Sequence, residues 1–119
     1  MKAAVLEQAG QPLQLRDLEL RNLADGDVVV RIAATSLCHT DLEAVQGHLG
    51  MPLPFIPGHE AAGVVEQVGR DVSNVKPGDP VVISWNPHCG GCFYCKRHQP
   101  ILCQQYRDHA AAEIGRAHV

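Results

Sequence analysis

The chain has 119 residues, with 10 Lys and Arg against 13 Asp and Glu, which gives a formal net charge of −3. Its length suits one small domain with a modest core, for which a bound metal ion would add stability. The sequence has no basic run and no apolar stretch long enough to span a bilayer, so neither nucleic acid nor a membrane is an expected partner.

Short segments with strand character dominate the first 85 residues. The first of them, at the N-terminus, is too poor in apolar residues for a signal peptide, so we expect a cytoplasmic protein. Runs rich in Val, Ile, Leu and Ala predict five strands, at residues 2–7, 14–20, 27–34, 61–68 and 80–85. Turn sequences at residues 24–26 and 76–79 separate some of these strands.

The remaining segments are a short helix, a loop and an irregular lobe. We expect the helix at residues 38–45, with Ser36 or Thr40 as its cap and Asp41 in its first turn. Three prolines make residues 51–57 a loop, and residues 86–103 have no regular pattern. Many short strands joined by Gly- and Pro-rich turns predict a mainly β, barrel-like domain.

Four of the five cysteines lie close together, with gaps of two, two and seven residues, at Cys89, Cys92, Cys95 and Cys103. This spacing lets four thiolates surround one zinc ion, and Gly90 and Gly91 allow the tight turn that it needs. A closed shell of four sulfurs indicates a structural site. An iron–sulfur cluster and four buried free thiols are the alternatives, and His88 and His98 are expected beside the site, not in it.

A second group of metal-binding residue types is spread over two segments. Cys38 lies at the start of the predicted helix, and His59 and Glu60 precede the fourth predicted strand. A thiolate and an imidazole suit zinc with an open coordination position, and Asp41 is a natural partner for the imidazole. Each residue alone has an ordinary structural explanation, such as a small buried cysteine.

These motifs together resemble the N-terminal, GroES-like domain of the zinc-dependent medium-chain alcohol dehydrogenases. The matching segments occur in the family's order: LCHTD at residues 37–41, PGHEAAGVVE at 57–66, VKPGD at 75–79, and then the four-cysteine lobe. The resemblance extends from residue 1 to about residue 105, and it implies a GroES-like, partly open β-barrel. The family's nucleotide-binding Rossmann domain is not encoded in these 119 residues.

The resemblance also implies roles for individual residues. Cys38 and His59 are ligands of a catalytic zinc, Glu60 lies beside that zinc, and Asp41 orients His59. Thr40 carries the substrate proton, and His39 contacts the cofactor pyrophosphate. The substrate pocket includes Leu49 and Trp85, although Trp85 is equally explained as a core aromatic.

The implied activity is the interconversion of an alcohol and an aldehyde or ketone, with zinc as Lewis acid and hydride transfer to or from NAD(P). The family's oligomers imply a homo-oligomer. A primary alcohol, an aryl alcohol, a polyol and a thiol adduct of formaldehyde all remain open as substrates.

Two departures from the family pattern stand out. Many members have a relay histidine where this chain has Glu43, and the last catalytic zinc ligand, a cysteine, is missing from these 119 residues. The fragment alone is therefore expected to be inactive.

The chain's last seven residues, at positions 113–119, match the translation of a common sequencing adapter. We therefore expect residues 1–112 to form the incomplete native domain and the tail to be non-native, with an ordinary polar tail as the alternative.

Two other functions are compatible with parts of the sequence. A non-enzymatic, zinc-stabilised β module would explain the lobe but not the combination of Cys38 with His59. A zinc-free relative, such as a quinone reductase, typically lacks the lobe.

Overall fold

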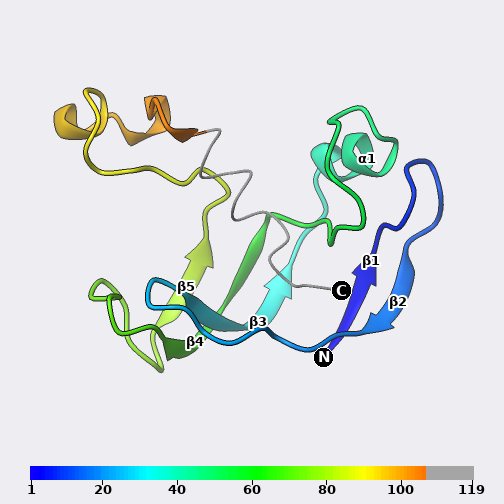
Figure 1. Ribbon diagram of the computed structural model, residues 1–119, viewed down its shortest axis with the longest axis horizontal. Helices are drawn as coiled ribbons and strands as arrows, with labels where there is room; N and C mark the ends of the chain where they lie inside the picture. The colour runs from blue at the N-terminus through cyan, green and yellow to red at the C-terminus, as the bar shows by residue number, and fades with distance from the viewer. Residues whose placement is uncertain (107–119) are drawn as a thin grey trace. The chain divides into compact units, whose positions relative to one another are not determined.

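The computed structural model describes residues 1–106, so the tail predicted at residues 113–119 lies outside the described residues. The chain divides into two units, one formed by Met1–Ile83 and the other beginning at Ser84. The elements of both are labelled in the ribbon diagram (Figure 1). Within residues 1–106, no helix has the length and apolar character that crossing a membrane requires.

The first unit contains two antiparallel sheets. Strands β1 (Lys2–Val5) and β2 (Gln14–Asp17) form one sheet. The second sheet has the order β3-β4-β5, with β3 at Val28–Thr35, β4 at Ala61–Val68 and β5 at Pro80–Ile83. The two sheets are not closed into a barrel, so the predicted mainly β, partly open architecture is confirmed.

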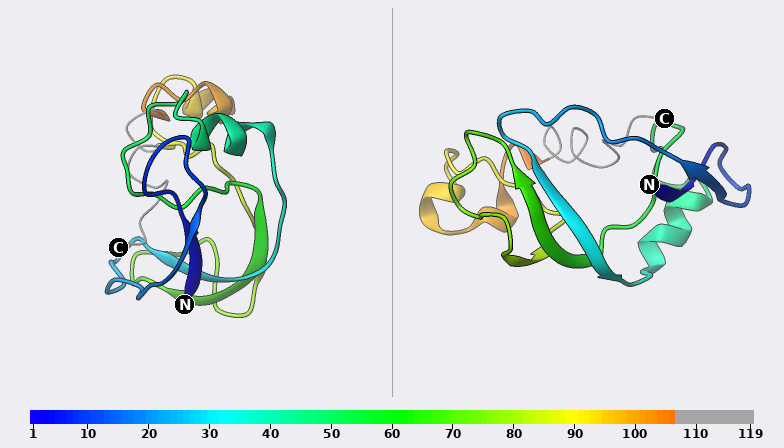
Figure 2. Two further views of the ribbon diagram at one scale, coloured as in Figure 1. Left: turned by 90° about the vertical axis from the view of Figure 1, so that its right-hand side faces the viewer. Right: turned by 90° about the horizontal axis from the view of Figure 1, so that it is seen from below.

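Strands β3 and β4 lie side by side and curve along their length, as both views in Figure 2 show. Their register is irregular between Val29 and Val30 and between Ile32 and Ala34, and such bulges bend a strand and increase its twist. Gly63 faces Ile32 across the ladder, and a Cβ atom built on it would lie 2.3 Å from the main-chain oxygen of Arg31. The close approach of the two strands therefore requires glycine at this position.

Helix α1 (His39–Val45) and the loop after it cover the small core of the first unit. Leu6, Ala44 and Phe55 are buried there, and Val45 and Met51 pack against them. An isolated bridge joins Leu6 to Phe55, whose main-chain groups exchange hydrogen bonds of 2.8 and 3.1 Å. The core thus ties β1 to the proline-containing loop and to α1.

The cap of helix α1 differs from the prediction. Cys38, and neither Ser36 nor Thr40, occupies the N-cap position, and its main-chain N–H donates to Asp41 Oδ2 at 2.9 Å. Ser36 lies two residues before the N-cap, where its hydroxyl donates to the carboxylate of Glu60, and Thr40 lies inside the helix. The cap therefore comes from the carboxylate in the first turn, which also stabilises the positive N-terminus of the helix.

The second unit is the irregular lobe expected around the cysteines. Its described part holds two short 3₁₀ helices, η1 (Cys95–Arg97) and η2 (Pro100–Leu102). Gly90 adopts a φ of 70°, which fits the expected tight turn between the first two cysteines. Trp85 and Tyr106 meet edge to face with ring centroids 5.9 Å apart, so an aromatic contact joins the two ends of the described lobe.

Candidate metal centres

The four cysteines of the lobe form a compact cluster of sulfur atoms. The Sγ atoms of Cys89, Cys92, Cys95 and Cys103 all lie within 4.8 Å of one another. Cys89 and Cys95 are 4.0 Å apart, close to the edge of about 3.8 Å that a tetrahedral site with zinc–sulfur distances of about 2.3 Å would have. The cluster therefore fits a zinc ion held by four thiolates.

Main-chain N–H groups of the lobe point at these sulfurs. Cys92 donates to Cys89 Sγ at 3.3 Å, and Cys89 donates to Cys103 Sγ at 3.4 Å. Hydrogen bonds from main-chain groups, above all that of Cys95, lower the pKa of the Cys92 thiol to about 6. Burial raises the pKa of Cys95 to about 12, helped by its contact with Cys92. Without a metal, the cluster thus holds thiolate and thiol side by side, and a cation would draw off the remaining protons.

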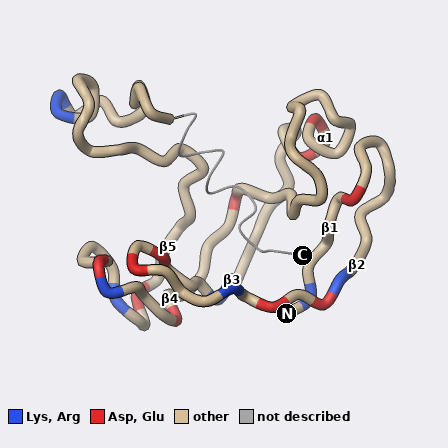
Figure 3. Tube along the Cα trace, viewed as in Figure 1, with Lys and Arg blue, Asp and Glu red and all other residues tan. Residues whose placement is uncertain are grey.

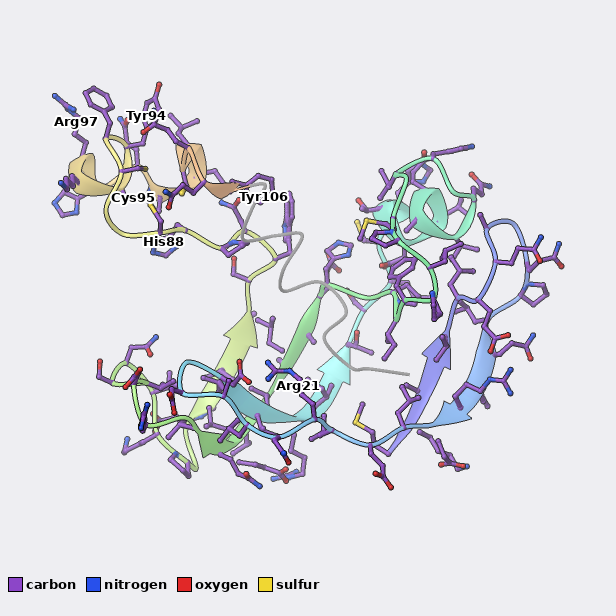
Figure 4. All side chains as sticks on the ribbon, in the orientation of Figure 1. Arg21, His88, Tyr94, Cys95, Arg97 and Tyr106 are labelled. Atoms are coloured by element: carbon purple, nitrogen blue, oxygen red, sulfur yellow. The ribbon has the colours of Figure 1, made fainter. Side chains whose placement is uncertain are left out.

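The lobe also contains a contact between a cationic and an aromatic side chain. Arg97 lies over the ring of Phe93, with 3.6 Å from its guanidinium carbon to the ring centroid. The side chains of Tyr94, Cys95 and Arg97 are labelled in Figure 4, and Figure 3 shows that the charged residues in the described part of the lobe are Lys and Arg. His88 and His98 are exposed and do not belong to the sulfur cluster, as expected.

A second cluster in the first unit joins the start of α1 to the start of β4. Cys38, His59 and Glu60 each place one potential ligand atom within 4.8 Å of the other two. The pairing of β3 with β4 brings these distant parts of the sequence together, because Thr35 lies opposite Ala61. The set of a thiol, an imidazole and a carboxylate fits a zinc ion with an incomplete protein shell, as in catalytic sites.

Asp41 links two members of this second cluster. Its Oδ1 lies 3.2 Å from His59 Nδ1, and its Oδ2 accepts the main-chain N–H of Cys38. The side chain is buried, which strengthens both contacts. Because Nδ1 of His59 is engaged by the carboxylate, Nε2 remains for a metal ion.

Neighbouring groups favour the charged forms of the Cys38 thiol and the His59 imidazole. Hydrogen bonds from Thr40, first from its main chain and then from its hydroxyl, lower the pKa of Cys38, and His59 lowers it further. Burial opposes the charge on His59, but its hydrogen bond with Cys38 and the charge of Asp41 outweigh it and raise the pKa of His59. The Oγ1 atom of Thr40 lies 3.6 Å from Cys38 Sγ, so this hydroxyl borders the cluster.

The other residues singled out in the sequence lie outside the two clusters. His39 is exposed, and its Nε2 lies 3.2 Å from Glu43, which also contacts His48 Nδ1 at 2.9 Å. Leu49 is 48% exposed on the loop after α1. Trp85, in the lobe, is 53% exposed, which argues against a core aromatic.

Two polar contacts of this region were missed from the sequence: the carboxylate bridge between the two histidines, and the hydroxyl of Ser36 on Glu60. The i,i+4 spacing of His39 and Glu43 on the predicted helix could have indicated one arm of the bridge, whereas no spacing pattern marks the contact of Ser36 with Glu60.

Comparison with known proteins assigns the chain to a family. Residues 24–117 match the model of the alcohol dehydrogenase GroES-like domain, and the chain belongs to this family. It is 46% identical over 102 residues to the NDMA-dependent alcohol dehydrogenase of Amycolatopsis methanolica, a match that covers 86% of the chain. It is also 46% identical over 111 residues to an alcohol dehydrogenase of Geobacillus stearothermophilus, covering 91% of the chain.

Solved structures agree with this assignment. The fold is similar to that of an alcohol dehydrogenase zinc-binding domain protein from Burkholderia ambifaria, with a TM-score of 0.81 and 42% identity over 88% of the chain and 28% of the relative. It is also similar to benzyl alcohol dehydrogenase from Acinetobacter calcoaceticus, with a TM-score of 0.81 and 35% identity over 88% of the chain and 29% of the relative. The chain spans only 28% and 33% of the two alcohol dehydrogenases matched by sequence.

Proposed function

We propose that this chain is the N-terminal part of a zinc-dependent alcohol dehydrogenase that interconverts an alcohol and an aldehyde or ketone with NAD(P). The observation that carries the proposal is the cluster of Cys38, His59 and Glu60, oriented by Asp41. The family membership and the alcohol dehydrogenase relatives support the same activity.

In this proposal, zinc would make the substrate oxygen more acidic or polarise a carbonyl, and the nicotinamide would accept or donate the hydride. Cys38 and His59 hold the metal from the two segments that β3 and β4 bring together. Asp41 fixes the imidazole through Nδ1 and the main chain of Cys38 through its second oxygen. One carboxylate therefore aligns both ligands.

The hydroxyl of Thr40 is the proposed first proton acceptor for the substrate alcohol. Its Oγ1 lies beside Cys38 Sγ, at the edge of the cluster where a substrate oxygen would bind. A hydroxyl can accept one proton while it donates its own, so it can pass charge onward without becoming charged itself. For the onward path of the proton, the cofactor ribose and Glu43 are both candidates, and neither is required.

His39, Leu49 and Trp85 have proposed roles in binding. The exposed imidazole of His39 would contact the cofactor pyrophosphate, and the two apolar side chains would line the substrate pocket. The four-cysteine lobe would hold a structural zinc, because its four sulfurs leave no open coordination position. We propose a cytoplasmic homo-oligomer as the full-length form.

Zinc content and turnover of the full-length gene product test the proposal. We expect two zinc ions per chain and NAD(P)-dependent oxidation of alcohols. Cys38→Ser should abolish turnover and leave one zinc bound, whereas Cys103→Ser should remove the other zinc and lower stability. One zinc per chain without turnover would favour the non-enzymatic β module, and normal turnover in Cys38→Ser would refute the site.

A further inference from the structure

The end of strand β3 holds Glu60 through three hydrogen bonds. The main-chain oxygen of Glu60 accepts the Thr35 hydroxyl at 2.9 Å and the Ser36 N–H at 3.0 Å. The Ser36 hydroxyl donates to the side chain, at Oε2 of the carboxylate. Two neighbouring hydroxyls thus act on one residue in different ways, one on its main chain and the other on its functional group.

The strand register explains why Ser36 reaches the carboxylate. Thr35 pairs with Ala61 at the end of the β3–β4 ladder. Because the strands are antiparallel, Ser36, which follows Thr35, and Glu60, which precedes Ala61, come next to each other just beyond that pair. Glu60 is exposed, and a glutamate side chain with no partner would sample many rotamers in water. The hydrogen bond from Ser36 to an ionised carboxylate is charge-assisted and selects an orientation in which an oxygen lies within 4.8 Å of the Cys38 and His59 ligand atoms.

From this geometry we infer that Ser36 is a positioning residue that aims the Glu60 carboxylate at the metal site of Cys38 and His59. The inference rests on the proposed function and extends it to a residue outside the ligand set. The hydroxyl engages Oε2 of the carboxylate, as Asp41 engages Nδ1 of His59, and a carboxylate that accepts one hydrogen bond still has lone pairs for a metal ion. Outer partners of this kind typically change metal affinity by about 10- to 100-fold when they are removed.

Titration with Co²⁺ tests the inference on the complete 119-residue chain. One equivalent of zinc is added first to fill the four-sulfur lobe, and Co²⁺ binding to the second cluster is then followed by its visible absorption. Ser36→Ala should weaken Co²⁺ binding by about 10-fold and alter the spectrum. Ser36→Thr, which keeps a hydroxyl, should restore most of the affinity.

Thr35→Val is the matched control. It removes the neighbouring hydroxyl and its bond to the Glu60 main chain while keeping the branched shape of the side chain. We expect its Co²⁺ affinity to stay close to that of the unsubstituted chain. An equal loss in Thr35→Val and Ser36→Ala would mean that Ser36 only supports the strand end, and would overturn the inference.

A double substitution separates positioning from general damage. If Ser36 acts through the carboxylate, then Ser36→Ala should cost no further affinity in a Glu60→Ala background. Unchanged Co²⁺ affinity in Ser36→Ala, or a full additional loss in the double variant, would refute the role of Ser36. Neither result would count against the metal site or the proposed function. Failure of the unsubstituted chain to bind a second metal ion would refute the three-residue site and this inference together, while zinc content and turnover of the full-length protein would still decide the proposed function.

Discussion

Gly63 offers a sharp test of how closely β3 and β4 approach each other. An alanine Cβ at this position would lie 2.3 Å from the Arg31 main-chain oxygen and 2.8 Å from Val30 Cγ1. Real Cβ contacts begin near 3.0 Å, so the strands must separate by about 0.7 Å at a hydrogen-bonded part of the ladder. Overpacking of this kind costs about 1–3 kcal/mol, and we expect the upper half of that range because the obstacle is main chain.

Urea unfolding and thermal melting of the zinc-loaded chain, both followed by far-UV circular dichroism, measure this cost. For a chain of this size, a loss of about 2 kcal/mol lowers the melting temperature by on the order of 10 °C. Gly26→Ala is the control, because its Cβ would meet nothing within 4 Å and its φ is not positive. A Gly63→Ala variant as stable as Gly26→Ala would refute the strand spacing described here.

Three further predictions concern a cap, a turn and the sulfur cluster. Asp41→Ala removes the acceptor of the Cys38 N–H at the start of α1 and should lower the free energy of unfolding by about 1 kcal/mol. Asp41→Asn keeps an acceptor and should lose less stability. Denaturant titration of the two variants compares these losses. The side-chain and main-chain hydrogen bonds of Lys76 lower the pKa of Asp79 below 3.8, so this carboxylate stabilises the turn above that pH and loses its effect as the pH falls through its folded pKa. The melting temperature of Asp79→Asn should accordingly lie below that of the unsubstituted chain at neutral pH, with the gap closing below about pH 4 in calorimetric scans. Because burial holds Cys95 protonated at neutral pH, zinc binding must release at least one proton. Zinc affinity, measured by chelator competition, should therefore fall at least about tenfold for each pH unit of acidification. An affinity independent of pH would contradict this.

Local sequence patterns predicted most elements of the fold but not all of their ends. Residues 61–68 were predicted as a strand and form β4 over the same range, since its apolar residues and its pairing on both sides agree. The strand predicted at residues 14–20 ends at Asp17, because its antiparallel partner β1 begins at Lys2, opposite Asp17, and the ladder stops there. Strand ends depend on the partner, which the local sequence does not contain.

The two metal clusters differ in how far the sequence could predict them. The lobe cysteines are close along the chain, so their spacing alone indicated one ion. The proximity of Cys38 to His59 depends on the β3–β4 register, and it was expected from their donor types and the family resemblance, not from their spacing. The contact between Ser36 and Glu60 depends on side-chain rotamers at a strand end, and no sequence pattern marks it. The roles of Thr40 and His39 stay predictions until the full-length protein is assayed.

The edge-to-face pair of Trp85 and Tyr106 gives the lobe an optical label of its own. Trp85 is the chain's only tryptophan, so selectively excited indole emission comes from the lobe and not from the two sheets. Loss or gain of the ion in the sulfur cluster can thus be followed by fluorescence, independently of the unit that carries the second cluster. This signal therefore follows the melting of the lobe alone, without any engineered probe.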